Sequence, residues 1–232
     1  MTGTDEIKEG VRKTYDRIAP HFAVTRDRVW PPTRDIIKEH APCRVGDLGC
    51  GTGRALVEAA GLGCRVTGID SSPGQLQMAR SSLERSGHIE NAVLMEGDLE
   101  ELPLGDEVLD LCLMIAALHH LPDRKARTRA LEEAYRVTAE GGFLQVSVWT
   151  WDQERFRKDH LSRIEGRREP GKHDGPLPGD FFVPWKKGAE GMRFYHLFGP
   201  GELEEELSMT GWTLLRSFFD GRNHWAECVK AP

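Results

Sequence analysis

Short apolar runs alternate along this sequence with amphipathic segments whose apolar residues recur at helical spacing. Such alternation is typical of βαβ units, in which each helix connects two parallel strands. The pattern therefore predicts a single α/β domain over residues 1–232, with a mostly parallel sheet. The expected strands are 43–48, 65–70, 92–96, 108–115, 142–149, 212–219 and 224–229.

The helix between the second and third strands has the clearest start signal. Ser72 is followed by Pro73 and, three residues after the serine, by Gln75, the pattern of a capping box with proline in the first helical position. A further helix is expected over 123–138, ended by Gly141-Gly142 before the fifth strand. Two helices are expected ahead of the first strand, at 5–18 and after Pro31-Pro32, and a short one with Leu203 and Leu207 before Gly211.

Residues 151–199 interrupt the alternation. They show no sustained periodicity and are rich in glycine, proline and charged residues. A loop of this length inside a compact domain is usually functional or mobile. We expect 151–199 to be an insertion loop on the substrate side of the domain.

A glycine-rich run, V-G-D-L-G-C-G-T-G at 45–53, joins the first strand to a helix. Glycines let the backbone turn tightly and approach a ligand closely, and the helix start presents free N–H groups. The dinucleotide pattern G-x-G-x-x-G fails here, because Arg54 and Leu56 occupy the two positions where its last glycine would stand. The order D-x-G-x-G-x-G instead resembles the first motif of class I S-adenosylmethionine (SAM)-dependent methyltransferases.

This resemblance implies a doubly wound, mostly parallel seven-stranded sheet with helices on both faces, and SAM as the cofactor. It implies that Asp47 orients the SAM ammonium group and that Asp98 contacts the adenine amino group. Asp70 ends the second strand, where a carboxylate can accept hydrogen bonds from both ribose hydroxyls. A single acid at a strand end is alternatively a helix cap or a turn former. The expected cofactor-binding residues are Asp47, Gly49, Cys50, Gly51, Gly53, Asp70, Ser71, Asp98 and Leu99.

Several clusters outside the glycine loop are more specific. They are Y-D-R-I-A-P-H-F at 15–22 continuing to Trp30-Pro31, V-P-W at 183–185, and R-F-Y-H-L-F at 193–198 followed by G-E-L. In this order and spacing they resemble the tRNA wobble-uridine carboxymethyl methyltransferases of eukaryotes and archaea, over nearly the whole chain. The sequence departs from that family near its C-terminus, where Arg222-Asn223-His224-Trp225 replaces D-N-W-W and one contact is therefore in doubt.

The resemblance implies that the methyl acceptor is the carboxylate of 5-carboxymethyluridine at the wobble position of tRNA, and that the product is its methyl ester. A carboxylate is ionised at pH 7, so its site needs cations or N–H donors and no base. Residues 1–40 would form a helical lid that, with 151–199, faces the RNA. The candidates for holding the acceptor are Arg26, His119, His120, His196 and Arg222.

Each of these histidines has an alternative structural role, as a satisfied polar group beside a strand end. For His119 the position after the fourth strand favours the functional role, because open α/β sheets bind ligands at the carboxyl ends of their strands. Tyr195 and Trp185 are equally consistent with core packing and with stacking on a base.

The third strand, 92–96, lies at the sheet edge in the topology that the resemblance implies. Its centre is apolar, with Val93, Leu94 and Met95 in a row. An exposed edge can accept a strand from another chain. The family resemblance suggests a small zinc-binding methyltransferase activator protein as that partner. Alternatively, residues 86–92 or a helix cover the edge.

Composition narrows the function further. The chain is 39% hydrophobic and 29% charged, as expected of a soluble globular protein, and its net charge of −6 argues against binding tRNA unaided. That acidity favours the main alternative, a small-molecule carboxyl or C/N-methyltransferase. A non-catalytic module that binds the cofactor or a partner is a second alternative, opposed by the intact glycine loop.

The five cysteines are odd in number and none forms a C-x-x-C pair, so we predict neither a disulfide framework nor a metal site. Cys50 stands where a compact side chain suffices. No apolar stretch is long enough to span a membrane and no export signal precedes the domain. We therefore expect a cytoplasmic enzyme that does not bind membranes.

Overall fold

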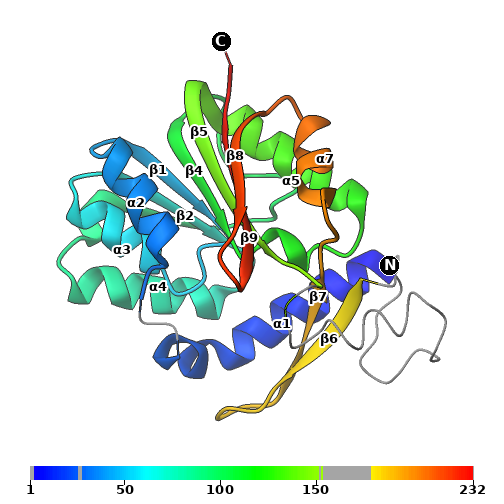
Figure 1. Cartoon of the computed structure of the whole chain (residues 1–232). Helices are drawn as coiled ribbons and strands as arrows, with labels where there is room; N and C mark the ends of the chain where they lie inside the picture. The colour runs from blue at the N-terminus through cyan, green and yellow to red at the C-terminus, as the bar shows by residue number, and fades with distance from the viewer. Residues whose placement is uncertain (1–2, 26–27, 152, 154–178, 232) are drawn as a thin grey trace.

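The computed structural model describes residues 3–25, 28–151, 153 and 179–231 (Figure 1). Its centre is a seven-stranded sheet in the order β3-β2-β1-β4-β5-β9-β8. The strands β1 to β5 pair in parallel, whereas β9 is antiparallel to both β5 and β8. The predicted doubly wound, mostly parallel sheet is therefore confirmed. The strands are β1 Arg44–Leu48, β2 Arg65–Asp70, β3 Ala92–Glu96, β4 Leu109–Ile115, β5 Thr138–Trp149, β8 Thr213–Phe219 and β9 Asn223–Val229.

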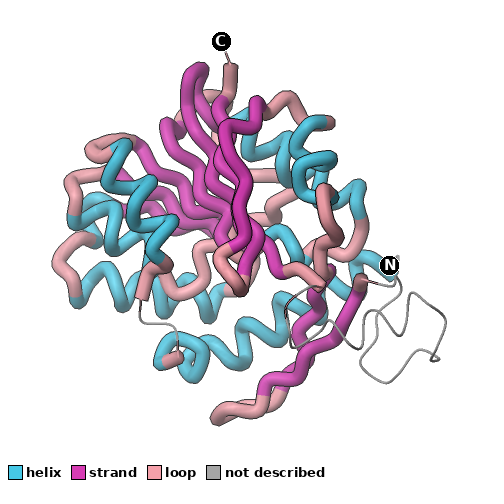
Figure 2. The backbone as a smooth tube through the Cα atoms, viewed as in Figure 1, coloured by secondary structure: helices cyan, strands magenta, loops and turns pink. Residues whose placement is uncertain are grey.

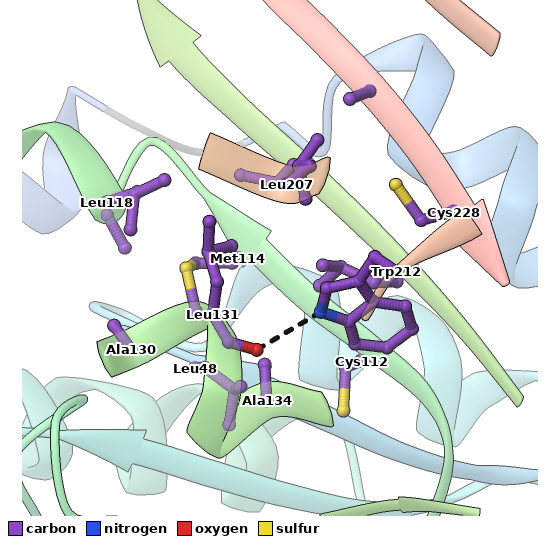
Figure 3. Close-up of a cluster of buried hydrophobic side chains, with 14 of the residues drawn as sticks. Leu48, Cys112, Met114, Leu118, Ala130, Leu131, Ala134, Leu207, Trp212 and Cys228 are labelled. Atoms are coloured by element: carbon purple, nitrogen blue, oxygen red, sulfur yellow. Dashed lines mark hydrogen bonds between the residues drawn. The ribbon is translucent and has the colours of Figure 1, made fainter. Parts of the chain in front are cut away.

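Helices cover both faces of this sheet, and each face has its own apolar core (Figures 1 and 2). On one face α5 and α7 pack over β4, β5 and β9. There the indole Nε1–H of Trp212 donates a hydrogen bond of 3.1 Å to the carbonyl of Leu131 (Figure 3). On the other face lie α2, α3 and α4. The helices are α1 Gly3–Val24, α2 Pro31–His40, α3 Arg54–Gly61, α4 Pro73–Arg85, α5 Arg124–Val137 and α7 Glu202–Ser208, with 3₁₀ turns η1 Ile89–Asn91 and η2 Leu118–His120.

Local signals placed the helix starts correctly. The Ser72 hydroxyl accepts the Gln75 backbone N–H at 3.2 Å, as the capping box predicts. Asp123 caps α5 in the same way, through the Ala126 N–H at 2.8 Å. The Gly141-Gly142 pair, however, does not close the crossover. It lies inside β5, where Gly141 adopts a positive φ of 72° and the pairing register shifts between Leu109 and Leu111.

Residues 151–199 were expected to be a loop, and their described part corrects this. Strands β6 Asp180–Trp185 and β7 Gly191–His196 form an antiparallel hairpin. Each strand has only six residues, and the glycines, prolines and charges around them hide the short apolar pattern. Strand β7 packs along α1, so hairpin and helix lie together beyond one end of the sheet (Figure 2).

Helix α1 is also longer than the expected 5–18. It continues through Pro20 to Val24, although a proline usually ends or kinks a helix. Helix α1 packs against β7 and α4. Beyond the proline, the ring of Phe22 lies 5.6 Å from the ring of Trp185 on β6, so tertiary packing extends into the last turns. No helix in the described ranges combines the length and the apolar character needed to cross a membrane.

Candidate active site

A cavity of about 430 Å³ lies at the carboxyl ends of the parallel strands, under α1. Ligands bind at this edge in open α/β sheets, because the loops that leave the strands meet there. The walls are the loop after β1, the end of β2, residues 97–99 after β3, the η2 turn after β4, Trp149 at the end of β5, helix α1, and β7.

The glycine loop forms one wall through its unusual backbone. Gly49 and Gly51 have φ values of 83° and 53°, a region that other residues rarely adopt. A Cβ on Gly49 would lie 2.5 Å from the Ala117 side chain, so this position also needs glycine for space. Gly53 starts α3 beneath Ala79 of α4 and is not among the residues that line the cavity.

Asp70 fixes the glycine loop against the neighbouring strand. One carboxylate oxygen accepts the Gly51 N–H at 2.8 Å, and the other accepts the Ser72 N–H at 2.9 Å. Desolvation raises the pKa of Asp70, and these two backbone N–H groups lower it in part. Each oxygen keeps a lone pair, as a pair of ribose hydroxyls would require.

Asp47 is the most strongly perturbed acid of the site. Its side chain is 4% exposed on the cavity wall. Burial raises the pKa of Asp47 to about 7, although the positive charge of Arg54 opposes the shift. Burial likewise raises the pKa of the Cys50 thiol well above its usual value, so the thiol stays protonated on the cavity wall that Cys50 helps to line.

The far rim is closed by an ion pair between helix and loop. Lys8 of α1 contacts the Asp98 carboxylate at 2.6 Å and also pairs with Glu100. Asp98, Leu99 and Ser71 all line the cavity. Helix α1 therefore covers the predicted adenine side of the cofactor site.

These residues fit SAM. A loop that needs glycine lies beside two carboxylates, the buried Asp47 and the half-buried Asp70, which suit an ammonium group and ribose hydroxyls. The wall also carries buried polar atoms without a partner in the described structure, as expected where a polar ligand binds. They are Thr33 Oγ1, Gln75 Oε1, His119 Nε2 and Arg193 Nε.

His119 is fully buried, and its tautomer follows from its surroundings. Nδ1 accepts the Trp149 backbone N–H at 3.0 Å, so the proton of the neutral ring is on Nε2. Burial lowers the pKa of His119 well below its usual value, and His120 lowers it further. His119 therefore offers the cavity an N–H donor and no positive charge.

His120 also lines the cavity, but both of its ring nitrogens are occupied. Nδ1–H donates to the Phe194 carbonyl at 2.7 Å, so Nε2 accepts the Tyr15 hydroxyl at 2.9 Å. Burial lowers the pKa of His120 to about 4, and the ring is neutral at pH 7.

The structure does not bring His196 and Arg222 to the cavity. His196 is bonded at 2.8 Å to Asp180 through Nδ1 and at 2.8 Å to Glu202 through Nε2, at the base of the hairpin where β6 begins and β7 ends. Arg222 stands in the turn before β9, outside the cavity walls. Arg26 lies outside the described residues.

Sequence reasoning missed several cavity residues, of which Gln75, Trp149 and Arg193 are the most notable. Gln75 was read only as part of a helix cap. Arg193 stands in the R-F-Y-H motif, which did mark it, but the segment was expected to be a loop.

Comparison with known proteins agrees with this site. Residues 46–146 match the family described as methyltransferase domain. A protein of Encephalitozoon cuniculi that is named as a methyltransferase, without a substrate, is 32% identical over 88% of each chain. The chain thus belongs to the class I SAM-dependent methyltransferases, and its cofactor is SAM.

Two further comparisons concern a curated relative and a solved structure. The tRNA (carboxymethyluridine(34)-5-O)-methyltransferase of Schizosaccharomyces pombe is 28% identical over 96% of each chain. The crystal structure of a SAM-dependent methyltransferase from Methanosarcina mazei has a TM-score of 0.70 and 23% identity, over 88% of this chain and 99% of that one. The latter shows a shared fold.

Proposed function

We propose that this enzyme transfers the SAM methyl group to the carboxylate of 5-carboxymethyluridine at the wobble position of tRNA, giving the methyl ester. The observation that carries the proposal is the likeness to the S. pombe enzyme over 96% of both chains. That span takes in α1 and the β6–β7 hairpin. Methyltransferases that act on other substrates share the core, so these outer elements are the informative part.

The cavity suits this chemistry. SAM supplies an electrophilic methyl group, and a carboxylate oxygen attacks it without first losing a proton. The protein then has to hold the acceptor in line and keep water away. His119 presents a neutral N–H donor to the cavity, which fits an acceptor that is already an anion.

Helix α1 would act as the lid of this site. Its Asp16 carboxylate accepts the Gly74 N–H at 2.7 Å, and its Tyr15 carbonyl accepts the Gln75 side-chain N–H at 3.1 Å. These bonds tie α1 to the start of α4, directly over the cavity. With the hairpin, α1 would form the surface that faces the tRNA.

The proposal also includes a partner protein, which would bind at the β3 edge of the sheet. Strand β3 is an edge strand of the described sheet, and Val93 at its centre is 54% exposed. Such an edge can be extended by a strand of a small zinc-binding activator protein. A partner would also offset the net charge of −6, which opposes tRNA binding by the chain alone. We expect the complex to work in the cytoplasm.

That acidity favours the second candidate, a small-molecule methyltransferase. One assay separates the tRNA enzyme from the small-molecule enzyme. The purified protein is incubated with labelled SAM and with total tRNA from a strain that lacks its own wobble methyltransferase. We expect label in that tRNA, and none in tRNA from a strain that cannot make the carboxymethyl group. Label only in a panel of small acids would replace the tRNA proposal, and running both assays with and without the activator tests the partner.

A further inference from the structure

Arg193 of β7 is a buried cation on the cavity wall. Its side chain is 5% exposed, and its Nη1 donates to the Tyr195 hydroxyl at 2.9 Å. The Nε–H has no hydrogen-bond partner. No carboxylate of the described residues lies within ion-pair distance of the guanidinium. An arginine side chain stays charged at every working pH, so this positive charge is permanent.

A buried charge of this kind is normally matched by an opposite one, because removal from water is costly. The faces of Trp185 and Tyr195 lie 5.1 Å and 5.4 Å from the Arg193 guanidinium and attract it. Attraction to a ring face is weaker than the penalty of burying an unpaired ion. The rings therefore hold Arg193 in place without neutralising it.

The other cations of the cavity differ in this respect. Lys8 pairs with Asp98, and Arg12 pairs with Glu9 at 2.7 Å. Arg54 lies near enough to Asp47 to lower the pKa of that acid. Arg193 has no such carboxylate in the described structure. Among these cations, its positive charge is therefore the one that no described acid neutralises.

A second unpartnered donor lies beside it. The His119 Nε2–H is buried without a partner, and the His119 ring lies 5.0 Å from the ring of Tyr195, which Arg193 also contacts. The acids Asp47 and Asp70 belong to β1 and β2, whereas His119 follows β4 and Trp149 ends β5. Because the sheet order is β2-β1-β4-β5, the two strand-end acids lie on one side of the cavity and His119 and Trp149 on the other.

We propose that Arg193 and the His119 Nε2–H form a receptor for the carboxylate of the methyl acceptor. The identity of that acid rests on the proposed function, whereas the receptor rests on the cavity alone. Arg193 acts as the residue that selects an anionic acceptor, and the aromatic rings around it fix its direction. The competing sources of a carboxylate are the acceptor and the methionine part of SAM, and the test separates them.

The test uses a matched pair of RNA probes. One is an anticodon stem-loop that carries 5-carboxymethyluridine, and the other carries the neutral amide, 5-carbamoylmethyluridine, in its place. Binding of each to the protein, with its activator and with S-adenosylhomocysteine bound, is measured by calorimetry. We expect the wild type to prefer the acid by about tenfold to a hundredfold, the range of a hydrogen bond to a charged group.

Arg193→Met should bind both RNAs equally, with the acid weakened to the level of the amide. Arg193→Lys should keep part of the preference, because it restores the charge without the planar fork. S-adenosylhomocysteine affinity should stay within about twofold in both variants. A wild type without acid preference, or a preference that survives in Arg193→Met, overturns the receptor. A large loss of S-adenosylhomocysteine affinity does so too, because it assigns Arg193 to the cofactor.

Failure of the tRNA proposal has a different signature. If the wild type binds neither RNA, phenylacetate and phenylacetamide replace them as probes. An acid preference that disappears in Arg193→Met then supports the receptor while the tRNA substrate is abandoned. If Arg193→Met instead methylates the RNA with the wild-type KM, the tRNA function is supported and the receptor is overturned. Should Arg193→Met not fold, the wild type and Arg193→Lys give the same comparison.

Discussion

The carboxylate of Asp70 accepts the backbone N–H of Gly51 at 2.8 Å, although the two residues stand 19 positions apart. Its second oxygen accepts the Ser72 N–H at 2.9 Å. One side chain at the end of β2 thereby positions both the glycine loop after β1 and the start of α4. Asp70 shapes the cofactor site whether or not it also contacts the ribose.

Asp70→Ala should weaken SAM binding by about 1–3 kcal/mol, because it removes a charged acceptor and releases the loop that this acceptor holds. Asp70→Asn is the matched control, since its one amide oxygen can still accept the Gly51 N–H. We expect an intermediate affinity for Asn by calorimetry. Equal affinities for wild type and a folded Ala variant would remove Asp70 from the site.

Asp47 should make the stability of the cofactor-free protein depend on pH. Its folded pKa of about 7 lies above the unfolded value of roughly 3.9, so the folded state binds the extra proton between them. The contribution of Asp47 to stability is full below pH 4 and is lost as the pH rises through 7. Between pH 5 and 8 we expect the free energy of unfolding to fall by about 2–3 kcal/mol more in the wild type than in Asp47→Asn. Urea denaturation at the two pH values measures this, and equal pH dependence would contradict it.

The same acid should govern cofactor affinity in the opposite direction. If ionised Asp47 pairs with the SAM ammonium group, binding strengthens as the pH rises through about 7, where the carboxyl loses its proton. Calorimetry at pH 6 should detect proton release on binding, and Asp47→Asn should bind weakly with little pH dependence. A wild-type affinity that is flat from pH 6 to 8 would contradict this pairing.

The buried ion pair between Arg127 of α5 and Glu206 of α7 holds these helices together. Its atoms approach to 2.6 Å, and the side chains are 2% and 0% exposed. Arg127→Met should destabilise the protein by about 3–5 kcal/mol, because Glu206 is left buried and unpaired. Arg127→Met with Glu206→Gln should recover part of this loss in urea denaturation. Arg129→Met removes two pairs of 3.5 Å on the same helix, to the exposed Glu132 and to Glu133, which keeps Arg136 at 2.7 Å; it should therefore destabilise the protein far less than Arg127→Met.

Val93→Lys tests the proposed partner at β3. The residue is 54% exposed, so the change should cost the isolated enzyme little stability. Co-purification with the activator and methylation of tRNA should be lost together. Leu215→Lys, at a 56% exposed position on the opposite edge strand β8, should preserve both. Full activity of Val93→Lys, or of the wild type without a companion, would exclude β3 as the docking edge.

The sheet was predictable because its signals are local. Residues 92–95 of the third strand and 111–115 of the fourth are continuous apolar runs, and the Ser72 cap is encoded within four residues. The β6–β7 hairpin was not predictable in this way, since its strands are stabilised by packing on α1, about 180 residues away in sequence, as the Tyr15–Tyr195 contact illustrates. Past Pro20, α1 likewise contacts a distant element, through Phe22 and Trp185 of β6.

The same distinction between local signals and tertiary contacts applies to the candidate site. The cofactor residues follow strand ends, so their position could be inferred from the strand pattern. Histidines cannot be sorted in this way, because their role depends on neighbours from other elements. His119 received a backbone donor from β5, whereas His196 received the carboxylates of Asp180 and Glu202. The sequence did not single out Arg193 as a site residue. The absence of a carboxylate beside its guanidinium is a property of the folded structure and not of the local sequence.

The hydrogen bonds around Tyr15 run in one direction. Arg193 donates to Tyr195, Tyr195 to Tyr15, Tyr15 to His120 Nε2, and His120 Nδ1–H to the Phe194 carbonyl. His119 has already used its only lone pair on Trp149. Neither imidazole of this wall can therefore take up a proton from a bound molecule. A hydroxyl or ammonium acceptor would find no imidazole to deprotonate it here, so the enzyme would distinguish acceptors by their ionisation state before their shape.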